Sequence, residues 1–288
     1  MSIGTSGCLQ QCGRGEVKVC KTCLRAVESD HGAKKIMRKE NLRKSALILL
    51  TMLSLISVQA QDKHTATYNQ VWVGYFNQTR FSNKWGMWTD LHLRTKEDFF
   101  TNFSQSILRF GLTYYLNDAT KLTAGYAYVS NYPGDNHGDV TQPEHRAWQQ
   151  VQWHNKYAKV RTMQWFRLEE KFKRKILNES ELASGYTFNY KVRYNFYLQV
   201  PLSKKGIQPN TLSFVVNDEV HINFGKQIVY NYFDQNRFFL GFSFQTNKSD
   251  NLQFGYMNLF QQLASGNHYK MINAARIFYF HNIDLRKK

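Results

Sequence analysis

The amino-acid sequence predicts an all-β protein: an antiparallel up-and-down transmembrane β-barrel of 10–12 strands. Apolar and polar residues alternate with period two along most of the chain after residue 60, and most alternating stretches exceed ten residues. All 21 Phe, 17 Tyr and 6 Trp also lie after residue 60. Successive side chains of a strand point to opposite faces, so these stretches predict long strands with one apolar and one polar face.

The segment that begins at Met37 predicts a cleaved export signal. It has a basic start, an uncharged apolar run over 46–58, and small residues at Val58 and Ala60, the −3 and −1 positions of a cleavage site. This is the layout of a secretory signal peptide. The apolar run is shorter than the roughly 20 residues that a membrane-spanning helix needs, so a permanent anchor is the weaker interpretation. We expect cleavage after Ala60.

The chain therefore divides into three parts. We expect 1–36 to be an extension produced by a mis-assigned start of translation, 37–60 to be the signal peptide, and 61–288 to be the β-barrel domain. The extension holds the four cysteines of the sequence, Cys8, Cys12, Cys20 and Cys23. Four thiolates can bind Zn²⁺, but the seven residues between the two pairs include no apolar core to pack around a metal. We predict no metal site and no cofactor.

The clearest strand covers 184–202. Its even positions from Tyr186 to Leu202 are all apolar or aromatic, whereas most odd positions are polar or charged. Soluble proteins usually have strands of about 5–6 residues. The same pattern marks eleven stretches: 67–79, 84–96, 104–116, 121–131, 144–154, 159–171, 184–202, 210–224, 235–246, 251–262 and 268–280. Because bacterial single-chain barrels usually have an even number of strands, we expect ten or twelve.

The connections predict a meander. Short turns rich in Asn and Asp, at 82–83, 117–118, 155–156 and 247–250, alternate with longer stretches at 131–143, 172–183, 225–234 and 263–267. Asn, Asp and Gly favour hairpin turns. A closed barrel pairs all its backbone groups, as a segment in lipid requires. We therefore expect the bacterial outer membrane as location, with membrane lipid and the barrel-insertion machinery as partners. A soluble secreted barrel is the alternative, and it would turn the apolar faces inward.

Several segments resemble the bacterial domain-of-unknown-function family 2490. They are "QVWVGYFNQTRFSNKWGMWTDLHLR" near the start, "PEHRAWQQ" at 143–150, "KVRYNFYLQVPL" at 191–202, "VNDEVHINF" at 216–224, and "DQNRFFLGFSF" with "LQFGYMNLFQQ" near the end. The resemblance covers roughly 66–280. It implies an outer-membrane barrel and supplies no activity.

If the apolar faces meet lipid, the charged side chains of the strands point into the lumen. The predicted lumen set has eight basic and four acidic members: Arg94, Arg109, Arg146, Arg161, Arg167, Lys191, Arg193 and Arg237, with Asp90, Glu144, Glu169 and Glu219. Charged rings set the selectivity of pores, so one interpretation is a narrow channel or a binding site for small anionic solutes. The other is a structural or assembly barrel whose lumen is filled by ion-paired side chains.

Other functions have weaker support in the sequence. A lipid hydrolase needs a Ser nucleophile within reach of a His, and no Ser forms a local motif with His92, His145, His154 or His221. We therefore expect no enzyme. The formal net charge of +17 does not by itself indicate nucleic-acid binding in an exported chain, and the oligomeric state is left open.

Overall fold

The computed structural model describes residues 63–97, 99–133, 139–157 and 159–286. The expectations for 1–36 and 37–60, including the four cysteines and the signal peptide, lie outside these residues. The described residues form eleven strands: β1 (His64–Arg80), β2 (Trp85–Glu97), β3 (Thr101–Tyr115), β4 (Thr120–Asn131), β5 (Gln142–Tyr157), β6 (Val160–Ile176), β7 (Leu182–Pro201), β8 (Thr211–Phe224), β9 (Phe233–Gln245), β10 (Asp250–Gln262) and β11 (His268–Asp284).

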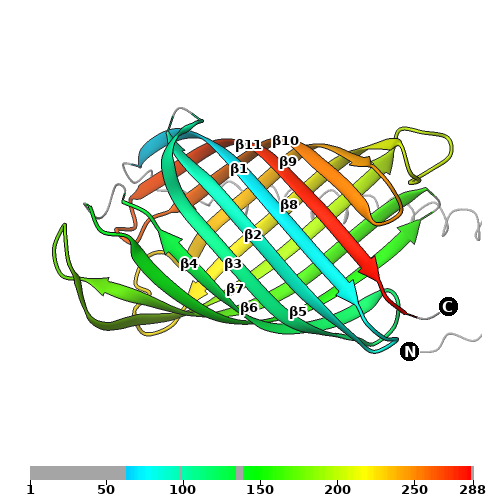
Figure 1. Ribbon diagram of the computed structural model, residues 1–288. Helices are drawn as coiled ribbons and strands as arrows, with labels where there is room; N and C mark the ends of the chain where they lie inside the picture. The colour runs from blue at the N-terminus through cyan, green and yellow to red at the C-terminus, as the bar shows by residue number, and fades with distance from the viewer. Residues whose placement is uncertain (1–62, 98, 134–138, 158, 287–288) are drawn as a thin grey trace, which may run out of the picture. The chain divides into compact units, whose positions relative to one another are not determined.

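The strands close into one barrel in which each strand pairs with its neighbours in sequence (Figure 1). Consecutive strands are antiparallel, and β1 closes the barrel by pairing in parallel with β11, from His64 opposite His268 to Arg80 opposite Asp284. The eleven strands of the described residues confirm the predicted all-β barrel of 10–12 strands, whereas the narrower expectation of an even number, ten or twelve, was wrong. An odd number closes without a free edge because the first and last strands can form a parallel ladder, which pairs their backbone groups as completely as an antiparallel one.

The apolar face of the strands lies on the outside of the barrel. Outward-facing Leu108 and Phe110 of β3 are 49% and 52% exposed, whereas Arg109 between them points inward and is 4% exposed. The same alternation recurs on β8, where Glu219 and His221 are buried while Ile222 is exposed. This arrangement is the reverse of a soluble barrel, which buries its apolar face. No helix of the described residues is long and apolar enough to cross a bilayer.

Aromatic pairs gather on the outer surface near both ends of the barrel. Near the end where β1 finishes, Trp85 contacts Tyr114 with ring centroids 5.0 Å apart. Near the other end, the rings of Tyr190 and Phe224 stack at 5.2 Å. The 13-residue β2 is about 43 Å long at 3.3 Å per residue, and a tilt of about 40° gives it a height of about 33 Å. That height exceeds the roughly 25 Å apolar band of outer-membrane barrels.

A glycine pair allows two strands to pack closely around a lumen tryptophan. Gly111 of β3 lies opposite Gly125 of β4. A Cβ atom on Gly125 would lie 2.1 Å from the backbone oxygen of Phe110, and one on Gly111 would lie 2.9 Å from the ring of Trp148. Side chains at these two positions would push β3 and β4 apart and displace the ring of the fully buried Trp148.

Candidate functional site

The barrel encloses a cavity of about 950 Å³. Its lining extends from Ser104 and Lys270, near the start of β3 and β11, to Lys248 and Asn282 at the opposite end. Among the described lining residues, thirteen are Lys or Arg and four are Asp or Glu. The lumen is therefore strongly basic over its length.

The structure places the twelve predicted lumen residues on the inner face in the following way. Ten of them line the cavity: Arg94, Arg109, Glu144, Arg146, Arg161, Arg167, Lys191, Arg193, Glu219 and Arg237. Asp90 and Glu169 lie behind the lining and are 0% and 1% exposed. Arg161, near the start of β6, is exposed at the cavity mouth. Buried carboxylates thus lie beneath a lining in which cations predominate.

Asp90 is the centre of the first of two charge clusters. Its carboxylate accepts hydrogen bonds from Arg109 Nη1 at 2.9 and 3.0 Å and from the indole Nε1 of Trp88. His92 Nε2 lies 3.0 Å from the same carboxylate. The strand register sets this geometry, because Asp90 of β2 lies directly opposite Arg109 of β3. The negative charge of Asp90 neutralises the positive charge of Arg109, so this cluster has no unpaired charge that would attract a ligand.

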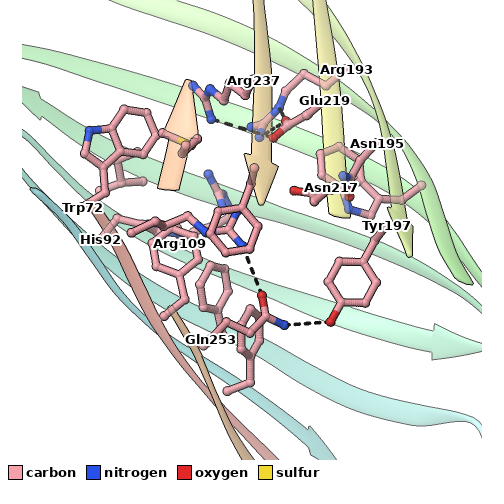
Figure 2. Close-up of a pocket in the computed structure, with 18 of the residues that line it drawn as sticks. Trp72, His92, Arg109, Arg193, Asn195, Tyr197, Asn217, Glu219, Arg237 and Gln253 are labelled. Carbon is pink, nitrogen blue, oxygen red and sulfur yellow. Dashed lines mark hydrogen bonds and ion pairs between the residues drawn. The ribbon is translucent and has the colours of Figure 1, made fainter. Parts of the chain in front are cut away.

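The second cluster joins β5 to β8 through Glu169. Arg193 Nη1 contacts Glu169 Oε1 at 2.5 Å, Arg146 Nη1 contacts Oε2 at 3.3 Å, and Arg167 Nη1 lies at 3.8 Å. Arg193 also forms an ion pair with Glu219, the contact visible in Figure 2. The carboxylates hold the arginines at fixed positions around the cavity, so the network both fills part of the lumen and orients its cations.

Several ionic residues that line the lumen were not in the predicted set, among them Asp234, His221 and Lys171. Lys191 forms an ion pair with Asp234, and His221 lies 2.8 Å from Glu219. Lys171, the last residue of the predicted strand 159–171, contacts Glu144 at 3.4 Å. The signal for Lys171 was present, since it follows Arg167 and Glu169 at the even spacing of one strand face. Asp234 carried no such signal, because the register of β8 and β9 shifts at this residue, where Ile222 pairs with Phe233 and His221 with Gln235.

Part of the inner face is apolar, although the alternation predicted strands whose inward face is polar. A buried cluster inside the barrel has most of its members on β1 and β9–β11, among them Trp72, Phe239, Met257, Leu259 and Ile272. These strands carry apolar residues on both faces, so their alternation is weak. The cluster forms one wall of the cavity.

Figure 2 shows Trp72 of this wall, with Gln253 and Tyr197 below it joined by a dashed line. Gln253 accepts a hydrogen bond from Arg276 at 3.1 Å and donates one to the Tyr197 hydroxyl at 3.1 Å. The hydrogen-bond partner of Arg276 is therefore a neutral amide, unlike the carboxylate partners of the arginines in the Glu169 cluster.

The described residues include no group of three or more His, Cys, Asp or Glu side chains placed to hold a metal ion. The two His–Asp contacts of the lumen each join a single histidine to a single aspartate, His92 to Asp90 at 3.0 Å and His221 to Asp234 at 3.9 Å. The chemistry that this site offers is recognition of negative charge by guanidinium and ammonium groups.

Comparison with known proteins identifies a family. A family model described as "Protein of unknown function (DUF2490)" matches residues 69–270. The chain belongs to this family. The match covers most of the barrel and confirms the resemblance drawn from the sequence segments. No curated protein and no solved structure shows a match to the chain.

Proposed function

We propose that this chain is a bacterial outer-membrane β-barrel that takes small anionic solutes into a basic lumen. The observation that supports the proposal most strongly is the cavity lining, in which thirteen cationic residues accompany four acidic ones. Side chains of one charge that line a pore attract ions of the opposite charge and make the pore selective for them. The apolar exterior and the two groups of aromatic pairs support a lipid environment around it.

Planar-bilayer recording of the purified barrel in a salt gradient tests the proposal. We expect a conductance whose reversal potential indicates preference for the anion. Heat-modifiable migration and the need for detergent to extract the protein from outer membranes test the membrane location. A monomer that is fully soluble without detergent contradicts the membrane location, and a cation-selective conductance contradicts the role of the basic lumen.

A second candidate function, a structural or assembly barrel, has an observation of its own. The Glu169 cluster and the buried ring of Trp148 occupy part of the cross-section. Barrels of moderate size often have interiors filled by side chains. Silent recordings across many insertions would favour this candidate over the first.

A further inference from the structure

Two lumen arginines lie on either side of one tryptophan and have no acidic partner. Trp72 of β1 is in register with Arg94 of β2 and with Arg276 of β11. Within the described residues, neither guanidinium forms an ion pair with a carboxylate. Arg94 donates to Gln105 Oε1 at 2.7 Å, and Arg276 donates to Gln253 Oε1 at 3.1 Å. The Nε of each arginine is buried and has no hydrogen-bond partner.

The charges around Arg94 make an anion favourable at this place. Four other lumen arginines lie within electrostatic range of it: Arg109, Arg146, Arg193 and Arg237. A desolvated cation without a counter-charge is costly, and the cost rises when like charges surround it. The other four all have carboxylates within 4 Å. An anion that enters the cavity therefore gains most beside Arg94 and Arg276.

An apolar surface lies next to these two arginines. The guanidinium carbon of Arg94 lies 3.6 Å from the ring centroid of Trp72, and that of Arg276 lies 3.4 Å from that of Phe239. Beyond the rings, Leu259 and Ile272 continue the buried apolar cluster and line the cavity. A hydrated inorganic anion would leave this surface unused, since it has no apolar part to place there.

We infer that the lumen binds amphipathic carboxylates, with the acid group at Arg94 and Arg276 and an acyl or aryl body against the apolar wall. The inference rests on the proposed function and names the class of solute. The cavity of about 950 Å³ falls within the range of roughly 300–1,000 Å³ of small-molecule sites. Sites of that kind are mostly apolar with a few well-placed polar groups, as this wall is.

The test is displacement of 8-bromooctanoate, whose bromine quenches tryptophan fluorescence, from the purified full-length barrel in nonionic detergent. Octanoate, acetate and octanol serve as competitors. Acetate keeps the acid and lacks the chain, so we expect it to bind at least about 100-fold more weakly, because each buried methylene contributes about 0.8 kcal/mol. Octanol keeps the chain and lacks the charge, and we expect a loss of about tenfold or more, the value of a charged hydrogen bond.

Three variants locate the two halves of the site. Arg94→Gln is expected to weaken octanoate about tenfold and to leave octanol unchanged. Leu259→Asn is expected to weaken octanoate and to leave acetate unchanged. Arg174→Gln is the matched control, because Arg174 lies over the ring of outward-facing Tyr186 and is not among the residues that line the cavity.

The outcomes separate this inference from the function on which it rests. An anion-selective conductance together with equal binding of octanoate and acetate overturns the inference and leaves the proposed function standing. Equal binding of octanoate and octanol overturns the role of the two arginines. An equal loss of octanoate binding in the Arg94→Gln and Arg174→Gln barrels overturns the location of the site. If the barrel shows no conductance and 8-bromooctanoate is not displaced, both proposals are overturned.

Discussion

Glu169 is the residue on which the lumen charge network depends most. It is 1% exposed, and its two carboxylate oxygens meet Arg193 at 2.5 Å, Arg146 at 3.3 Å and Arg167 at 3.8 Å. Replacing it with Gln keeps the volume and removes the negative charge, which leaves like charges facing one another. Breaking a buried ion pair by removing one partner costs about 3–5 kcal/mol. Because the adjacent cavity can admit water that partly solvates the arginines, we expect the lower value, about 3 kcal/mol.

Urea unfolding of the detergent-solubilised barrel measures this loss, with fluorescence from the lumen tryptophans as the signal. At an m-value of about 1–3 kcal/mol/M, a loss of about 3 kcal/mol lowers the midpoint by about 1 M or more. Glu170→Gln is the matched control, since it makes the same chemical change one residue further along β6, where the side chain points to the other face. Equal midpoints for Glu169→Gln and Glu170→Gln would refute the assignment of Glu169 as the counter-charge of the three arginines.

Three further predictions concern other parts of the chain. Gly125→Ala should destabilise the barrel by about 1–3 kcal/mol, the usual cost of overpacking, and an unchanged thermal midpoint in heat-modifiability gels would contradict the close approach of β3 and β4. Intact-mass measurement of the exported protein should give a chain that begins at Gln61, and a chain that begins before Met37 would contradict the predicted start of translation. The hydrogen bond from Arg80 lowers the pKa of Asp118 in the turn after β3, so any stability from this contact is present at neutral pH and is lost as the pH falls through the lowered pKa. Asp118→Asn should remove that part of the acid dependence, and an identical dependence in the two proteins would show that the contact contributes nothing.

Local alternation explains why much of the barrel could be predicted from the sequence. Each of the eleven predicted stretches overlaps one observed strand, because period two reports directly which side chains share a face. The alternation along β3 also grouped correctly the residues of its outward face, Leu108, Phe110 and Leu112. Charged residues on the opposite face of such a strand then point to the lumen.

What the sequence could not give is non-local. The parallel closure of β1 with β11 joins residues about 200 positions apart, and alternation within either strand says nothing of the other strand's direction. The apolar wall was missed for a different reason. Around Phe239 and Phe278 both faces of the strand are apolar, so alternation no longer separates inside from outside, and Arg276 was not recognised as a lumen residue.

The central claim is that the apolar face of the barrel meets lipid while the polar face meets an anion-accessible lumen. Val216 and Asn217 are adjacent residues of β8 and test the claim directly. Asn217 lines the cavity, and Val216 belongs to the opposite, outward face of the strand. Single-cysteine variants are simple to make, since the chain from Gln61 contains no cysteine. With a fluorophore on each cysteine in proteoliposomes, we predict that brominated lipid quenches Val216→Cys and that iodide quenches Asn217→Cys. Quenching of Val216→Cys by iodide and of Asn217→Cys by brominated lipid would contradict the account.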